Sequence, residues 1–308
     1  MSIDTILGAI ELGLIFAIMS YGIYITFKIL NFPDLTVDGS FTLGGVVSAS
    51  LALQNHSFLG LVLAMLAGAF AGLFTGFLHT KMKVQYILAG IITMTGLYSI
   101  NLKIGKTPNL SLYGKDTIFT SFSKLLTHFN LPRGFVTQYH KVILLFMIVV
   151  LLGVLLYIFF KTQIGLAIRA TGNNEAMVRA SSINTDAMKM LGLTLANAFV
   201  ALSAGIYTQH QMFYDISQGI GMMVVGLTSI IVGESIFGKR SILHSFVSLI
   251  LGAVLYRLLL AFALSLGMEA SDWKLLSAAL VAILISIPTM KQYVKKKQQR
   301  TQRRNTSC

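Results

Sequence analysis

The strongest candidate for enzymatic chemistry in this sequence is a phosphate-binding loop at residues 233–240. The segment reads Gly233-Glu-Ser-Ile-Phe-Gly238-Lys239-Arg240 and imitates the pattern G-x-x-x-x-G-K-S/T, in which backbone N–H groups cradle phosphates and a hydroxyl binds magnesium. Arg240 stands at the hydroxyl position, and an apolar run long enough to span a membrane precedes the motif in place of a buried strand. We therefore reject the loop and interpret Lys239 and Arg240 as anchors at a membrane boundary.

Histidine and cysteine supply no second candidate for catalysis or metal binding. The 6 histidines follow no ligand spacing and lie mostly at the ends of apolar runs. The single cysteine is Cys308, so the sequence predicts neither a disulfide framework nor a metal cluster. No serine, histidine and carboxylate converge along the chain. The sequence thus predicts a protein that is not an enzyme and that has no metal and no cofactor.

Glu11 and Arg257 are charged side chains within long apolar runs. A charge at the bilayer centre costs roughly 2.5–3.5 kcal/mol on insertion scales, so each is expected to have a partner. Both lie at a similar depth from the same side in the topology derived below, and we predict a structural ion pair between them. An ion-coupled secondary transporter would also require a carboxylate such as Glu11, and this function stays open as an alternative.

These side chains must be positioned by an apolar scaffold. The chain has 308 residues, of which 55% are hydrophobic and 11% charged, and its mean hydropathy is +0.75. Ordinary soluble domains carry roughly 25% charged residues, so an ordinary soluble enzyme is excluded. The sequence predicts an all-α polytopic membrane protein with about nine transmembrane helices, and eight or ten as alternatives. The predicted spans are roughly residues 5–27, 36–54, 58–80, 84–102, 139–160, 190–211, 219–237, 241–266 and 271–289.

The distribution of basic residues predicts which side of the membrane each loop occupies. The net charge is +13, and Lys and Arg are concentrated in the tail and in the loops on the same side as the tail. By the positive-inside rule, the C-terminus is expected in the cytoplasm and the N-terminus outside. We predict one permease domain at residues 1–289, with a cytoplasmic loop at 161–189 and an external loop at 103–138. A basic cytoplasmic tail follows at residues 290–308.

The cytoplasmic loop 161–189 has the pattern of a short helix. Thr171 or Asn173 is a suitable N-cap, Glu175 lies in the first turn where the helix dipole favours an acid, and Asn184 is a plausible end. The residues that share one face of this helix are Ala176, Ala180 and Ile183. Such a helix suits the groove of a partner protein, although a connector on the membrane surface is an equal alternative.

The same loop carries a resemblance to a known family. The residues that carry it are Gly165, Arg169, Ala170, Gly172, Asn173, Ala176, Arg179, Ala180, Ile183 and Asn184. This run resembles the cytoplasmic loop of bacterial ABC-importer permeases of the branched-chain amino acid and monosaccharide permease family, with Ser182 where the family usually has glycine. The segment NFPDLTVDGSFTLGG, at residues 31–45, resembles a subgroup linked to amino-acid-type binding proteins, including proposed aromatic amino acid importers.

The resemblance implies a fold, a function and partners. The fold would be that of a type II ABC-importer permease, which forms the path for a small solute, here an amino acid, although a nucleoside or sugar would fit almost as well. The implied partners are cytoplasmic ATPase subunits, an extracellular or periplasmic substrate-binding protein, and a second permease, either a copy or a sister subunit. No nucleic acid partner is expected. The residues expected to contact the ATPase are Gly172, Asn173, Asn174, Glu175, Ala176, Met177, Arg179, Ala180, Ile183 and Asn184.

A weak internal repeat agrees with such a transporter. Ser20-Tyr-Gly22-Ile-Tyr24 and Phe32-Pro-Asp34-Leu-Thr36 are echoed by Ser203-Ala-Gly205-Ile-Tyr207 and Phe213-Tyr-Asp215-Ile-Ser217. In the predicted topology the two copies run in opposite directions, which is the inverted repeat common in transporters. A chance match between two apolar stretches is the alternative. Gly68, Gly72 and Gly76 share a helix face that is expected to pack within the chain rather than in a dimer.

After each copy of the repeat comes a segment that is a poor start for a helix. Broken helix ends at membrane depth survive only where they are buried in protein or line a wet cavity. We predict that these segments line the translocation path at the dimer interface; the alternative is that Asp34 or Asp38 simply caps the second span. The predicted path residues are Asp34, Thr36, Asp38, Ser40, Gly219 and Gly221.

Overall fold

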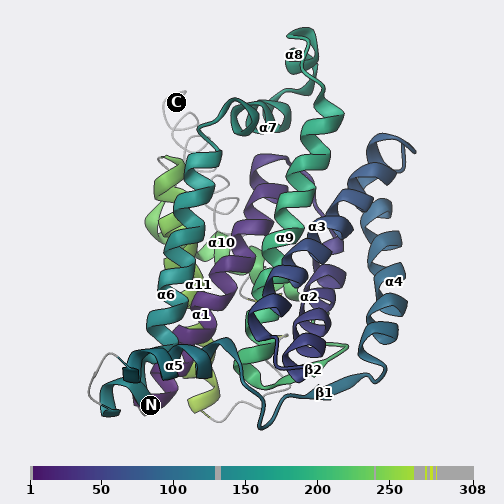
Figure 1. Ribbon diagram of the computed structural model, residues 1–308. Coiled ribbons are helices and arrows are strands. Elements are labelled where there is room, and N and C mark those ends of the chain that lie inside the picture. The colour runs from purple at the N-terminus through teal and green to yellow at the C-terminus, as the bar shows by residue number, and fades with distance from the viewer. Residues whose placement is uncertain are drawn as a thin grey trace, which may run out of the picture.

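The chain folds into a bundle of long helices, seen in a computed structural model that describes residues 3–128, 133–238 and 241–266, with the isolated positions 275, 278, 279 and 282 (Figure 1). The elements, in chain order, are α1 (Ile3–Tyr24), the π-helix η1 (Ile25–Ile29), α2 (Thr36–Leu53), α3 (Ser57–Thr80), α4 (Tyr86–Gly105), β1 (Asn109–Ser111), α5 (Ile118–His128), α6 (Arg133–Phe159), α7 (Gln163–Asn173), α8 (Glu175–Ala180), α9 (Thr185–Gln211), β2 (Phe213–Asp215), α10 (Met222–Phe237) and α11 (Ile242–Ser265).

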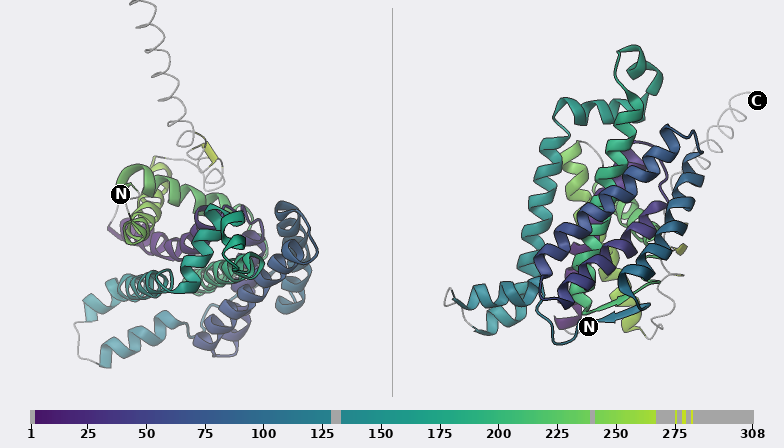
Figure 2. Two further views of the ribbon diagram at one scale, coloured as in Figure 1. Left: turned by 90° about the horizontal axis from the view of Figure 1, so that it is seen from above. Right: turned by 45° about the vertical axis from the view of Figure 1, so that its right-hand side comes forward.

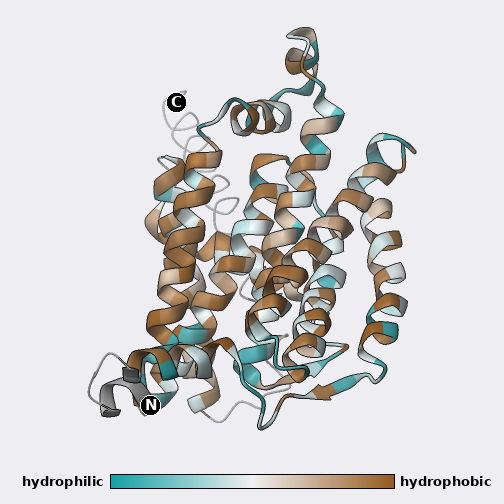
Figure 3. Ribbon diagram, viewed as in Figure 1, coloured by the Kyte–Doolittle hydropathy of each residue, from teal (hydrophilic) through white to brown (hydrophobic). Residues whose placement is uncertain are grey.

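The described helices confirm the predicted class of an all-α polytopic membrane protein. Seven of them are long and apolar enough to cross a membrane, and the apolar helix α10 is shorter, at 16 residues. Apolar residues cover much of the bundle helices, whereas polar residues gather at its two ends (Figure 3). These eight helices correspond to the first eight predicted spans. The ninth predicted span, at 271–289, and the predicted tail at 290–308 lie outside the described residues, so the count of nine is not confirmed.

The bundle has two different ends, which we name by their contents. The loop end carries α7 and α8, and the hairpin end carries α5, β1, β2 and the start of α1 (Figure 1). At the loop end α8 projects beyond the other helices, while at the hairpin end α5 extends sideways from the bundle (Figure 2). β1 pairs antiparallel with β2, so that Leu110 lies opposite Tyr214. The sequence predicted only an external loop at 103–138 and did not predict this pair of short strands.

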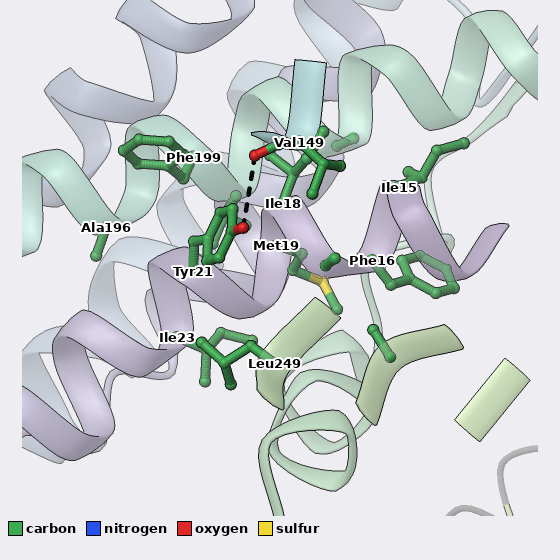
Figure 4. Close-up of a cluster of buried hydrophobic side chains, with 14 of the residues drawn as sticks. Ile15, Phe16, Ile18, Met19, Tyr21, Ile23, Val149, Ala196, Phe199 and Leu249 are labelled. Carbon is green, nitrogen blue, oxygen red and sulfur yellow. Dashed lines mark hydrogen bonds between the residues drawn. The ribbon is translucent and has the colours of Figure 1, made fainter. Parts of the chain in front are cut away.

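The hydrophobic core lies where α1 packs against α6, α9, α10 and α11. Tyr21 packs edge-on against Phe199 and Phe246, and its hydroxyl donates a hydrogen bond to the carbonyl oxygen of Val149 at 3.5 Å (Figure 4). Elsewhere in the bundle, glycines let the backbones of neighbouring helices approach closely. Such small residues are expected between membrane helices, because lipid provides no hydrophobic driving force for helix association and close packing must supply it. A Cβ at Gly72 would lie 2.2 Å from the carbonyl oxygen of Leu193 in α9. The glycine face of α3 therefore packs within the chain, as predicted.

The packing of the two halves agrees with an inverted repeat. α1 runs from the hairpin end to the loop end, and α9 runs the opposite way (Figure 1). α1 packs against α9, α10 and α11, while α9 packs against α1, α2 and α3. Suppose that α1, α2 and α3 of the first half correspond to α9, α10 and α11 of the second. The contact of α1 with α10 then corresponds to that of α9 with α2, and the contact of α1 with α11 corresponds to that of α9 with α3. The first helix of each half is thus inserted against the second and third helices of the other.

Candidate coupling loop and translocation segments

Three side-chain caps in succession shape the loop at the loop end. Thr162 accepts a hydrogen bond from the Gly165 N–H at the start of α7, Asn174 from Met177 at the start of α8, and Asn184 from Ala187 at the start of α9. The sequence predicted one short helix that Thr171 or Asn173 caps and Asn184 ends. This prediction is wrong in detail: Asn174 is the cap, α8 ends at Ala180, and Asn184 begins α9. Thr171 lies inside α7, where its hydroxyl instead donates to the carbonyl oxygen of Ala167.

A network of charges centred on Glu175 closes the loop on itself. One Glu175 oxygen lies 2.7 Å from Nη2 of Arg179, and the other lies 2.6 Å from Nζ of Lys189 on α9. Arg179 also donates from Nε to the Thr185 hydroxyl at 2.8 Å and lies 3.4 Å from Asp186. α8 is therefore braced against the first turns of α9.

The same network changes the acidity of Glu175. The hydrogen bond from Lys189 is the largest cause that lowers its pKa, and the charges of Lys189 and Arg179 and the Thr185 hydroxyl act in the same direction. A carboxyl whose folded-state pKa is lowered stabilises the fold above its unfolded pKa, and this contribution is lost as the pH falls through the folded value. The brace of α8 is thus present at neutral pH and weakens in acid.

The outer surface of α8 is mostly apolar. Met177 is 58% exposed and Ile183 is 38% exposed, and Ala176 and Ala180 are also exposed, whereas Val178 is buried. Arg179, which the sequence prediction placed at a partner contact, makes its hydrogen bonds within the loop, and 56% of its side chain is exposed. The exposed residues of the predicted ATPase contact include Asn173, Asn174, Ala176, Met177, Ala180, Ile183 and Asn184. A projecting loop with an apolar tip and a polar brace has the form of a docking element.

The loop is seated directly on the end of α1. A Cβ at Gly172 would lie 1.8 Å from the carbonyl oxygen of Ile29, so only glycine permits this approach. Asn31 Nδ2 donates to the Gly172 carbonyl at 3.1 Å. α7 is therefore in direct contact with η1 and with the segment that leads into α2.

Ser182 occupies the position at which the resembling family usually has glycine. It adopts a left-handed conformation, with φ 60°, which glycine adopts without strain. The structure thus gives a conformational reason for the glycine, and it places the departure of this chain at the turn between α8 and α9.

Asp34 is buried in the bundle although it belongs to a loop. Its Oδ1 accepts the Thr36 N–H at 2.9 Å, and its Oδ2 accepts Nδ2 of Asn197, near the middle of α9, at 2.7 Å. The hydroxyl of Thr36 continues a buried polar chain through Thr75 at 2.7 Å to Thr93 at 2.8 Å. This polar chain joins α2, α3, α4 and α9. The sequence missed Asn197, Thr75 and Thr93, because single polar residues within apolar runs gave no pattern.

Asp38 joins the two halves of the molecule. Its carboxylate accepts the Gly221 N–H at 2.8 Å and the Met223 N–H at 2.9 Å, at the first turn of α10. Of the two capping residues considered from the sequence, Asp34 binds the start of its own helix, and Asp38 binds the start of α10 instead. An acid at a helix N-terminus satisfies free N–H groups and is favoured by the helix dipole.

The segment before α10 turns back into the bundle. Gln218 donates to the Thr208 hydroxyl of α9 at 3.3 Å. A Cβ at Gly45 would lie 2.0 Å from Gln218, and one at Gly219 would lie 2.1 Å from the Asp38 carbonyl oxygen. The segment thus follows α2 from Gly45 to Asp38, a rise of about 10 Å along a helix. The predicted path residues Asp38, Gly219 and Gly221 lie together, beside Asp34 and Thr36; Ser40 is buried, and its hydroxyl has no hydrogen-bond partner among the described residues.

The predicted ion pair between Glu11 and Arg257 is wrong. Glu11 Oε2 lies 2.7 Å from Nε2 of His210 on α9, and the Arg257 guanidinium lies over the Phe16 ring, 4.1 Å from its centroid. No ion pair joins Glu11 to Arg257 in the described part of the chain. The position along each helix predicted that the two residues lie at a similar depth, but it did not predict which side of the helix each side chain occupies. Arg257 lines a pocket with Leu12 between α1 and α11, whereas Glu11 faces α9.

The rejected phosphate-binding motif is helical from Gly233 to Phe237, and Gly238 ends the helix. Gly233 lies in α10 and packs closely against Ser248 of α11, and Glu234 pairs with Lys28 at 2.7 Å. Lys239 and Arg240 lie outside the described residues. Nor do the described residues contain a group of three His, Cys, Asp or Glu side chains that could hold a metal ion.

A bundle of apolar helices long enough to cross a membrane, with a projecting loop at one end, has the architecture of an integral membrane protein. The family model described as branched-chain amino acid transport system, permease component, matches residues 5–287, and the chain belongs to this family. It is therefore the permease component of an ABC transport system.

Curated relatives cover nearly the whole chain. The sequence is 35% identical over 292 residues to a tyrosine transport system permease protein of Clostridioides difficile, covering 94% of each chain. It is 27% identical over 292 residues to the ribose import permease protein RbsC of Haemophilus influenzae, covering 93% of this chain and 84% of the relative. No solved structure matches the chain.

Proposed function

We propose that this chain is the transmembrane permease of an ATP-driven importer, and that it forms the path of a small solute, an amino acid, across a bacterial cell membrane. A separate cytoplasmic ATPase drives the cycle, and an external binding protein delivers the solute. The observation that carries the proposal is the loop at α7 and α8. Its apolar tip projects from the bundle while an internal ion-pair network holds its shape.

The position of the loop supports a mechanical role. Two copies of the permease, or this chain and a sister subunit, present two loops to two ATPases, with the loop end in the cytoplasm. When the ATPases close on ATP, they move α8, and the braced α8 moves the start of α9. Because α7 rests on Ile29 through Gly172, the motion reaches η1 and the Asp34 turn as well. The two halves then open the bundle toward the outside and accept the solute.

The relatives support an amino acid as the solute over a sugar. The tyrosine permease is 35% identical to this chain, whereas the ribose permease is 27% identical over a similar length. We propose that the solute has the class of an aromatic amino acid. The rival function, ion-coupled secondary transport, requires uptake by the chain alone.

Purification of the tagged chain in mild detergent tests the coupling site. We expect an ATPase to co-purify with the native chain, to be identified by mass spectrometry, and to be lost from the double variant Ala180→Asp, Ile183→Asp. The matched control is Tyr113→Asp, which adds a charge at an exposed aromatic residue outside the loop. Equal recovery of the ATPase with both variants would contradict docking at α8.

Uptake into vesicles tests the solute and the energy source. The purified chain, its ATPase and the cognate binding protein are reconstituted, and labelled tyrosine and labelled ribose are compared with and without ATP. We expect ATP-dependent uptake of tyrosine that excess ribose does not compete. Uptake by the chain alone, driven by an ion gradient, would establish the secondary transporter instead, and preferential uptake of ribose would overturn the amino acid assignment.

A further inference from the structure

A polar pocket of about 500 Å³ lies under the loop, between the end of α1 and α7. Its basic side chains are Lys28 and Arg169, and its amides are Asn31 and Asn173. Tyr24, Ile29, Leu166 and Ile242 contribute apolar or aromatic surface to the same pocket. A pocket with cationic, amide and apolar walls suits a ligand with an anionic head and an apolar body.

The charges leave the pocket with an excess of positive charge. Lys28 pairs with Glu234 at 2.7 Å, and its side chain remains 30% exposed. Arg169 is exposed, and its side chain forms no ion pair or hydrogen bond with the rest of the described chain. A planar guanidinium with several N–H donors binds phosphate well, because it can donate two hydrogen bonds to one phosphate group.

The surroundings of the pocket favour a lipid over a free ion. α7 lies across the end of the bundle (Figure 1), and its side chains Ile164 and Leu166 are 48% and 50% exposed. Leu166 is also part of the pocket wall. The pocket therefore opens beside exposed apolar surface at the loop end of the bundle. Basic pockets between transmembrane helices on the cytoplasmic side are suitable sites for anionic lipid head groups.

We propose that this pocket binds the phosphate group of an anionic phospholipid from the leaflet at the loop end. Arg169 binds the phosphate, with Lys28 beside it, and Asn31 and Asn173 supply amide donors. Since Lys28 and Asn31 follow α1 while Arg169 and Asn173 belong to α7, the bound lipid links α1 to the loop. Asn173 directly precedes the cap of α8, so the lipid stabilises the loop in the position that an ATPase must meet. The proposal concerns a separate site and does not depend on the identity of the solute.

Native mass spectrometry of the delipidated full-length chain tests this site. The chain is titrated with phosphatidylglycerol, with phosphatidylcholine and with inorganic phosphate. The variant is Arg169→Gln, and the control is Lys161→Gln, which removes a cation that lies over the Tyr157 ring outside the pocket. We expect phosphatidylglycerol to bind in preference to phosphatidylcholine, and Arg169→Gln to weaken its binding about fivefold, since one basic residue near an anionic lipid is worth about that factor.

The outcomes separate the lipid from its alternatives. Unchanged binding of phosphatidylglycerol by Lys161→Gln, together with weakened binding by Arg169→Gln, supports the pocket. Equal binding of both lipids, or equal loss in both variants, overturns the proposal. Saturation by inorganic phosphate that displaces phosphatidylglycerol from Arg169 would assign the site to a free anion. The double variant Lys28→Gln, Glu234→Gln, which removes a whole ion pair, is expected to bind the lipid more weakly than the native chain while it remains folded.

Discussion

The connection from α1 to α2 and the connection from α9 to α10 each contain a turn of the same kind, but the two turns lie in different surroundings. In each, an aspartate accepts the backbone N–H two residues later: Asp34 from Thr36 at 2.9 Å, and Asp215 from Ser217 at 2.7 Å. The first carboxylate is buried and also binds Asn197 of α9. The second lies in the short strand β2 at the hairpin end, where its bonds with Ser217 are exposed.

The difference shows how an inverted repeat can keep a local fold and change its role. The turn geometry depends only on an aspartate and the residue two positions later, so both halves of the sequence encode it. The surroundings of each turn depend on the opposite half of the chain. Asp34 of the first half binds Asn197 of α9, and the start of α10 is capped by Asp38 of α2. The first connection is therefore a buried link between the halves, and the second enters the bundle only after its turn, at Gln218 and Gly219.

The largest effect is expected from Asp34→Ala. The change leaves two buried N–H groups without an acceptor: the backbone N–H of Thr36, and one of the two N–H groups of the Asn197 amide, whose Nδ2 also donates to the Leu193 carbonyl oxygen. An unsatisfied buried donor costs about 1–3 kcal/mol, so the free energy of unfolding should fall by about 3 kcal/mol or more. Unfolding by sodium dodecyl sulfate titration in mixed micelles measures it.

Asp34→Asn is the matched control for that variant. Oδ1 of Asn197 has no hydrogen-bond partner in the described structure. After rotation of its amide, Asn197 can accept a hydrogen bond from the new amide at position 34, but it gives up the bond from its Nδ2 to the Leu193 carbonyl oxygen. The loss should therefore be smaller than that in Asp34→Ala without vanishing. Equal losses in the two variants would show that the buried negative charge, rather than hydrogen bonding, holds the connection.

The second largest effect is expected from Gly219→Ala, in the other connection. The added Cβ would lie 2.1 Å from the Asp38 carbonyl oxygen and 2.2 Å from the Thr42 hydroxyl, so the re-entrant segment must move away from α2. Forcing an extra carbon into packed surroundings costs typically about 1–3 kcal/mol. ATP-dependent uptake should fall with stability, because the displaced segment pulls on the cap of α10. Native stability and uptake in this variant would contradict the close packing of the two halves.

The sequence predicted the membrane-spanning helices well, because each of them is encoded by a long apolar run whose bounds follow from local composition. It also located the irregular connections before α2 and before α10, since proline, aspartate and glycine within such runs are local signals. It did not find the partner of Glu11, because His210 is distant in sequence and only the packing of α1 on α9 brings it near. Asn197 was missed because a single polar residue within an apolar run gives no pattern. The caps of the loop were misplaced by one residue or more, since several adjacent residues are good caps and tertiary contacts decide among them.

A smaller effect is expected from Gly221→Ala, two residues further along the same segment. No atom lies within 4 Å of a Cβ built at Gly221, so space is not the obstacle. Its φ of +85° is left-handed, however, and such a conformation costs a residue with a Cβ roughly 1–2 kcal/mol. The free energy of unfolding should fall by about 1 kcal/mol. Comparison of this variant with Gly219→Ala separates conformational strain from steric overlap; a loss larger than that of Gly219→Ala would show that the turn, not the contact with α2, controls the segment.

The smallest effect is expected from Asp215→Ala, which tests the comparison of the two connections directly. The variant removes the same turn hydrogen bond that Asp34→Ala removes, but at an exposed site where water replaces the lost acceptor. An exposed local bond of this kind contributes about 0.5–1 kcal/mol, so the free energy of unfolding should change several times less than in Asp34→Ala. The same denaturant titration measures both variants side by side. A loss at Asp215 as large as that at Asp34 would mean that the turn itself stabilises the bundle, and that burial against α9 adds nothing to the first connection.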